Sequence, residues 1–69
     1  MAESVYKLIE VVGTSPNSWE EAAAKAIEAA SKSLRDLRVA EVTKLDMKVE
    51  NGQVKFFRAR VNVSFKLES

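Results

Sequence analysis

The clearest hydrophobic pattern lies near the end of the chain, where apolar and polar residues alternate over residues 57–67. Such alternation is typical of an antiparallel strand with one face on a core and the other toward solvent. We therefore predict a long, half-buried strand with a polar face rich in arginine and lysine. The two sets are Phe57, Ala59, Val61, Val63, Phe65 and Leu67 on the apolar face, and Arg58, Arg60, Asn62, Ser64 and Lys66 on the polar face.

Two further segments have the composition of strands. Residues 5–12 are rich in β-branched residues and are followed by Gly13, which predicts a first strand. Residues 39–49 also alternate, but the apolar set changes phase, from Ala40 and Val42 to Leu45, Met47 and Val49. A phase change within a strand predicts a bulge or a strong bend. The pair Asn51-Gly52 then predicts a two-residue hairpin turn into the last strand.

Between the first two strands the pattern becomes helical. Ser18 is followed three residues later by Glu21, which is the capping-box pattern, and Ser15-Pro16 offers an alternative start one turn earlier. Apolar residues then recur at helical spacing on one face: Ala23, Ile27, Ala30, Leu34 and Leu37. We predict a helix from about residue 18 to residue 36, ending near Leu37, with a neighbour packed very close to its alanines.

The order β-α-β-β predicts an α+β fold in one domain that spans residues 1–69. The helix makes the first two strands parallel, and the hairpin makes the third antiparallel to the second. With the last strand in the middle, the result is a three-stranded antiparallel sheet packed on one helix. Both sheet edges then remain open, and open edges need cover.

The stretch VVGTSPNSWEEA lies where nucleotide-binding proteins place a phosphate. A Walker loop needs several glycines and a Gly-Lys-Ser/Thr ending, and a Rossmann turn needs three glycines. Here there is one glycine, and the next lysine is Lys25. We interpret Gly13 as a turn residue with positive φ and Ser15 or Ser18 as a helix cap, with weak attraction for an anion at most. Trp19 is interpreted as a packing residue or an interface anchor.

Composition narrows the function classes. The chain has 69 residues with no Cys and no His, which excludes disulfides, structural zinc sites and a Ser-His-Asp triad. The net charge of +1 argues against a nucleic-acid binder. A chain this short buries only about 60% of its unfolded surface, so we predict that it depends on oligomerisation. No run resembles a membrane span or a signal peptide, and we expect a cytoplasmic protein.

Three segments together resemble the dodecin family over nearly the whole chain: YKLIEVVGTSPNSWEEAAAKAI, LRDLRVAEV and FRARVNVSFKLE. The resemblance implies β-α-β-β subunits that assemble as a hollow dodecamer. It also implies binding of flavins (FMN or riboflavin) in pairs at subunit contacts, for storage or buffering rather than catalysis.

The residues that hold flavin in this family are replaced. The family places a stacking tryptophan at the start of the second strand, where this chain has Val39, and a hydrogen-bonding glutamine in the third strand, where it has Arg58. Valine offers no π-face, and arginine donates hydrogen bonds without accepting them. Both substitutions argue against ordinary paired-flavin binding, although an arginine plane can still stack on a ring.

The chain is more similar to a branch of dodecins that lacks the tryptophan and is described as calcium-binding. Calcium takes 6–8 oxygen ligands. The candidates here are Asp46, Glu41 and Glu10, which lie on or near strands and could meet across subunits. The alternative is that they are solvated or paired with nearby cations, namely Lys44, Lys48, Arg58 and Arg60.

The sequence thus favours a non-enzymatic, dodecin-like homo-oligomeric shell that sequesters a small ligand or ion, with calcium or an anion as the ligand. Two alternatives stay open: a flavin-buffering dodecin with an altered site, and a structural assembly without ligand. Catalysis without His or Cys would need paired carboxylates, a lysine or Tyr6, and no such set stands out.

Overall fold

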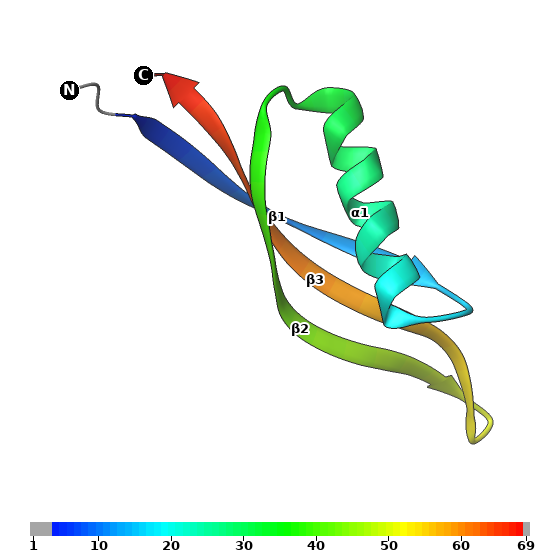
Figure 1. The fold of residues 1–69 in the computed structure, drawn as a ribbon. Coiled ribbons are helices and arrows are strands. Elements are labelled where there is room, and N and C mark those ends of the chain that lie inside the picture. Colours follow the sequence, from blue (N-terminus) through cyan, green and yellow to red (C-terminus); the bar gives the residue numbers. More distant parts are fainter. Residues whose placement is uncertain (1–3, 69) are drawn as a thin grey trace.

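The computed structural model describes residues 4–68 as one helix packed on a three-stranded sheet (Figure 1). The strand order is β1-β3-β2, and both neighbouring pairs are antiparallel. This confirms the predicted α+β fold with the last strand in the middle. The elements are β1 (Val5–Ser15), α1 (Trp19–Ser33), β2 (Leu37–Glu50) and β3 (Gln53–Glu68).

The hairpin and the bulge both form where the sequence predicts them. Asn51 and Gly52 have φ of 53° and 74°, which suits a two-residue turn with positive φ at both positions. The register of β2 against β3 shifts between Val42 and Lys44, which leaves Thr43 as an extra residue. The hydroxyl of Thr43 donates to the backbone carbonyl of Arg60 at 3.2 Å. The phase change in β2 is therefore a β-bulge.

The N-terminus of α1 uses both predicted serines. Ser18 is the N-cap, and its hydroxyl accepts from the backbone N–H of Glu21 at 3.0 Å. The Ser15 hydroxyl accepts from the backbone N–H groups of Asn17 at 2.9 Å and Ser18 at 3.3 Å, and it donates to the Glu21 carboxylate. This hydrogen bond from Ser15, followed by one from the Asn17 amide, holds the pKa of Glu21 below its ordinary value.

The helix is shorter than predicted. It ends at Ser33, and Leu37 is the first residue of β2 rather than the last apolar residue of the helix. Leu34 is already extended while its N–H still donates to the Ala30 carbonyl at 2.9 Å. Asp36 then adopts a left-handed φ of 57°, which turns the chain into β2.

Strand β1 is longer than predicted, and the prediction for Gly13 is wrong. The strand continues to Ser15, and Gly13 lies within it opposite Ala59, whereas the positive φ among the described glycines belongs to Gly52. Gly13 is needed for another reason. A Cβ there would lie 2.0 Å from the Ala22 carbonyl oxygen and 2.9 Å from the Ala26 Cβ. The glycine lets the helix backbone approach the sheet.

The core lies where α1 meets the middle of the sheet. Its buried residues are Ala22, Ala26, Ala30, Ala59, Val61 and Val63. The close packing of the helix alanines is confirmed, but the predicted face is displaced: Ala22 and Ala26 are central, while Ala23, Ile27 and Leu34 flank the core and are only partly buried. The smallest side chains occupy the line of closest approach, and the larger ones lie on either side.

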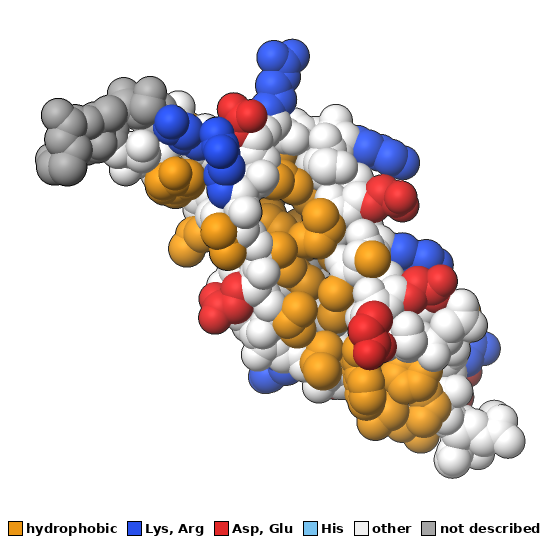
Figure 2. All heavy atoms as spheres, viewed as in Figure 1, with side chains coloured by type: hydrophobic (Ala, Val, Ile, Leu, Met, Phe, Trp, Pro, Cys, Tyr) orange, Lys and Arg blue, Asp and Glu red, His pale blue; other side chains and the backbone are white. Residues whose placement is uncertain are grey.

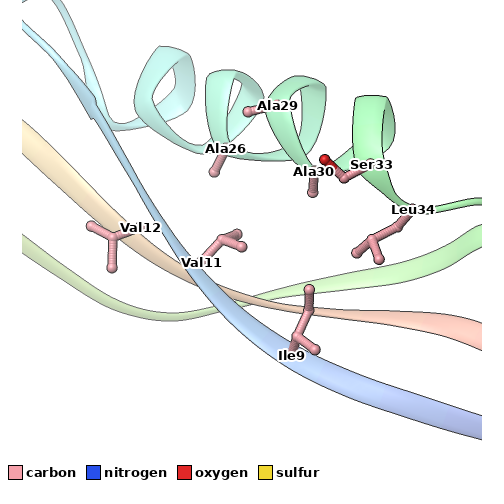
Figure 3. A pocket seen from close by; sticks show the side chains of 8 residues that line it. All are labelled: Ile9, Val11, Val12, Ala26, Ala29, Ala30, Ser33 and Leu34. Carbon is pink, nitrogen blue, oxygen red and sulfur yellow. The ribbon is translucent and has the colours of Figure 1, made fainter.

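The helix packs mainly on β1 and β3, so an apolar groove runs along each of its sides. In the groove between α1 and β1, Ile9 and Val11 point toward Ala26 and Ala30 (Figure 3). Figure 2 shows hydrophobic side chains gathered in a band between α1 and β2. The groove there is lined by Trp19, Glu20, Ala23, Val42 and Leu45. Within residues 4–68, no helix has the length and apolar character to cross a membrane.

Candidate functional site

All five candidate site residues lie on the sheet face that points away from α1, which we call the outer face. The outer face is the polar side of β3 together with the residues that pair with it in β1 and β2. Directly opposed residues in antiparallel strands bring their side chains together, so this face is organised in rows that cross the three strands. Four successive rows are Thr14–Arg58–Asp46, Val12–Arg60–Lys44, Glu10–Asn62–Glu41 and Leu8–Ser64–Val39.

In the first row Asp46 and Arg58 form a bidentate ion pair. The Nε of Arg58 donates to one carboxylate oxygen of Asp46 at 2.7 Å, and its Nη2 donates to the other at 2.8 Å. The hydrogen bond from Arg58 holds the pKa of Asp46 below its ordinary value and raises that of the guanidinium. Paired carboxylate and guanidinium planes of this kind are geometrically specific. Both groups are thus committed to each other within one chain.

The backbone of Asp46 also ties the sheet to the helix. Its carbonyl accepts a hydrogen bond from the Trp19 indole at 3.0 Å. The Trp19 ring meets Phe57 edge to face, with ring centroids 5.0 Å apart and an interplanar angle of 69°. The interpretation of Trp19 as a packing residue is therefore confirmed.

In the third row Glu10 and Glu41 flank Asn62. Each is the direct cross-strand partner of Asn62, on opposite sides, and both glutamates are exposed. Neighbouring strands are about 4.8 Å apart, so both carboxylates can converge above the amide of Asn62. Glu10 and Glu41 therefore share one row, on the two strands that flank β3, while Asp46 lies two rows away. No group of three or more acidic side chains suited to a metal forms within the described part of the chain.

Val39 and Arg58, the two positions predicted from the family resemblance to correspond to flavin contacts, both lie on the outer face but in different rows. Val39 is 64% exposed and lies opposite Ser64, whose hydroxyl donates to the Val39 carbonyl at 3.3 Å. Arg58 is six residues from Ser64 along β3, a separation of about 20 Å. One ring cannot contact both positions within a single copy of the chain.

Reasoning from the sequence did not single out Asn62, whose amide lies in the same row as both glutamates. It lies on the polar side of the predicted last strand, but nothing in the pattern distinguishes it from its neighbours there. Its role depends on the register, which places a glutamate on each side. On the β2 side, the register shifts between Lys48 and Val49 and at Thr43 cancel, so counting back from the hairpin turn does pair Glu41 with Asn62. The partner in β1 cannot be counted in this way, because no hairpin joins β1 to β3.

The comparisons with known proteins agree on one family. The family model described as Dodecin matches residues 5–68. The calcium dodecin of Mycobacterium tuberculosis is 48% identical over 64 residues, which cover 93% of this chain and 90% of that protein. The dodecin of Thermus thermophilus is 38% identical over 64 residues, which cover 93% of each chain.

Solved structures show the same similarity in three dimensions. A dodecin from Streptomyces coelicolor has a TM-score of 0.92 and 38% identity, with 100% of this chain and 99% of that chain covered. The crystal structure of calcium dodecin from M. tuberculosis has a TM-score of 0.83 and 48% identity, with 94% and 93% covered. That protein is described as a calcium-chelating antigen with a novel calcium-binding site.

Proposed function

Because this chain belongs to the dodecin family, we propose that it forms a non-enzymatic dodecamer that binds calcium on the outer faces of its sheets. The proposal has two parts, assembly and ion binding, and each rests on its own features of the chain.

Assembly is supported by the apolar surface that one copy leaves uncovered. Large hydrophobic side chains on the helix side of β2, including Val42, Leu45 and Met47, are 44–49% exposed. The groove between α1 and β2 is open beside them. Contiguous apolar surface of this kind marks an interaction site. β1 and β2 are also the two edges of the sheet, and unpaired edges are managed by covering them.

Calcium binding is supported by one observation above all, the row in which Glu10 and Glu41 flank Asn62. Two carboxylates and an amide carbonyl offer up to five oxygens, all of the hard type that calcium prefers. Calcium takes 6–8 ligands, so water or a second copy of the chain would supply the rest. The 48% identity to a protein named for calcium points to the same ion.

Asp46 does not join this site in our proposal. Its two carboxylate oxygens both accept from Arg58, at 2.7 Å and 2.8 Å. Recruiting Asp46 to a cation would break two charge-assisted hydrogen bonds, which are roughly twice as strong as neutral ones.

A flavin, either FMN or riboflavin, is the second candidate ligand. The observation in its favour is the row formed by Leu8, Ser64 and Val39, in which Leu8 and Val39 are each 64% exposed. These two exposed apolar side chains flank Ser64 on the outer face, where a ring could lie against them. The missing aromatic face at Val39 and the pairing of Arg58 with Asp46 place this candidate second. An assembly without ligand is the remaining alternative.

The test is a calorimetric titration of calcium into chelator-treated, assembled protein, repeated with Glu10→Gln, Glu41→Gln and the double variant. We expect each single change to weaken calcium binding at least tenfold, since each removes a charged ligand. Glu50→Gln is the matched control, because Glu50 lies on the same strand as Glu41 but outside the row, paired with Lys55 at 3.5 Å. Unchanged affinity in the double variant would overturn the proposed site.

A further inference from the structure

Beside the carboxylate row lies a row with the opposite charge. Lys44 and Arg60 are direct cross-strand partners on the outer face, and Val12 lies on the other side of Arg60. Like charges directly opposite each other destabilise a sheet. This arrangement is therefore unfavourable in one copy of the chain unless an anion neutralises it.

The bulge in β2 creates this juxtaposition. Thr43 is the extra residue, and the Thr43 hydroxyl donates to the Arg60 carbonyl at 3.2 Å. Side chains alternate between the two faces of a strand, so a one-residue shift moves every later side chain to the other face. In a regular strand Val42 and Lys44, two residues apart, would share a face, whereas here Val42 lies opposite Val61 on the helix side and Lys44 lies opposite Arg60 on the outer face. The bulge thus re-aims Lys44 to stand opposite Arg60.

Asp46, the carboxylate of the neighbouring row, attracts both cations: besides the hydrogen bond from Arg58, the charges of Arg60 and Lys44 also hold the pKa of Asp46 low. Asp46 is bound through both oxygens by Arg58. In the part of the chain that the structure describes, neither Lys44 nor Arg60 takes part in an ion pair. A small surface pocket opens at this place, lined by Val12, Lys44, Asp46, Arg58 and Arg60.

We propose that this pocket binds a phosphate group, with Arg60 and Lys44 as its principal contacts. The guanidinium of Arg60 presents planar, forked donors that match two phosphate oxygens, and Lys44 supplies a compact positive charge beside it. Arg58 engages Asp46 through Nε and Nη2, so its Nη1 donors remain for the same anion. This goes beyond the calcium proposal and does not depend on it, because the two sites use different rows.

The test is a titration of inorganic phosphate into the assembled protein in the presence of EDTA, at low ionic strength with chloride as the background anion. Lys44→Gln and Arg60→Gln are each expected to weaken phosphate binding about tenfold or more. Lys48→Gln is the matched control, since it removes the same charge from the same strand outside the pocket. Asp46→Asn is expected to tighten binding, because it removes a negative charge and frees Arg58.

Arg60→Lys distinguishes the loss of phosphate contacts from a loss of folding or assembly. It keeps the positive charge of the strand but loses the forked donors, so phosphate binding should weaken while the assembled mass stays unchanged. Glycerol phosphate in a parallel titration separates the two sources of the group. Binding of both probes assigns the pocket to phosphomonoesters, and binding of inorganic phosphate alone assigns it to the free anion.

Three results would overturn the phosphate pocket. The first is the absence of any heat of binding with either probe. The second is an equal loss of phosphate affinity in Lys48→Gln and Lys44→Gln. The third is weaker phosphate binding in Asp46→Asn. Because calcium is absent from these titrations, a failure of the calcium proposal leaves their outcome unaffected.

Discussion

Replacing Gly13 by alanine tests the closest contact in the fold. The new Cβ would lie 2.0 Å from the Ala22 carbonyl oxygen and 2.9 Å from the Ala26 Cβ, where real Cβ atoms stay beyond about 3 Å. The first neighbour is helix backbone, so no rotamer change relieves the contact. The helix must move about 1 Å away from β1, which loosens the packing of Ala22 and Ala26, now 0% and 4% exposed.

The expected loss in the free energy of unfolding is about 3 kcal/mol. Overpacking of a close-packed core costs about 1–3 kcal/mol, and a backbone clash belongs at the upper end of that range. Alanine recovers only about 0.4–1 kcal/mol through the lower entropy of the unfolded chain. A domain of 69 residues has a total stability of roughly 3–10 kcal/mol, so the change removes a large share of it.

Gly52→Ala is the matched control, because it is the same substitution at a glycine needed for a different reason. Gly52 has a φ of +74°, and a Cβ at this position would have no neighbour within 4 Å, so its cost is the left-handed backbone alone, about 1–2 kcal/mol. Urea unfolding followed by far-UV circular dichroism measures both variants. If Gly13→Ala were no more destabilising than Gly52→Ala, the packing argument for Gly13 would be refuted.

Three further predictions concern the interface, acid stability and the flavin positions. Leu45→Glu places a charge in the apolar groove beside α1, so the assembled mass measured by light scattering should fall. The lowered pKa values of Asp46 and Glu21 stabilise the folded state above the unfolded carboxyl pKa, and this stability disappears as pH falls through the folded-state values. In thermal melts with EDTA, the melting temperature should therefore fall as the pH drops below about 4. A melting temperature that stays constant there would contradict this prediction. Val39→Trp with Arg58→Gln should raise flavin affinity by fluorescence quenching, and no gain would count against the assignment of both positions.

The strands were predictable from sequence, because a long alternation of apolar and polar residues indicates both a strand and the face of it that is buried. The last strand, from Phe57 to Leu67, sets the sheet, and Asn51-Gly52 fixes the hairpin. The end of the helix was not predictable in the same way. Leu34 and Leu37 have helical spacing, but Leu37 serves equally well as the first residue of a strand, and the left-handed turn is made by Asp36 rather than by a glycine.

At Gly13 the sequence correctly indicated a position of structural importance, but the predicted reason, a positive φ, was wrong. Glycine permits positive φ and also permits close approach of backbone, and the sequence does not separate these two properties. Only the position of Ala22 over the strand shows that close approach is the reason. The candidate site has the same limitation. Glu10 and Glu41 could be selected by residue type, but their positions on either side of Asn62 depend on strand register, above all on that of β1 against β3.

Native mass spectrometry of the assembled protein, with and without calcium, tests the central claim most directly because it counts subunits and ions together. We predict a dodecamer whose mass increases by bound calcium, and a Glu10→Gln, Glu41→Gln variant that keeps the dodecamer mass without the increase. A folded monomer, or a dodecamer whose calcium uptake is unaffected by the double substitution, would contradict the account.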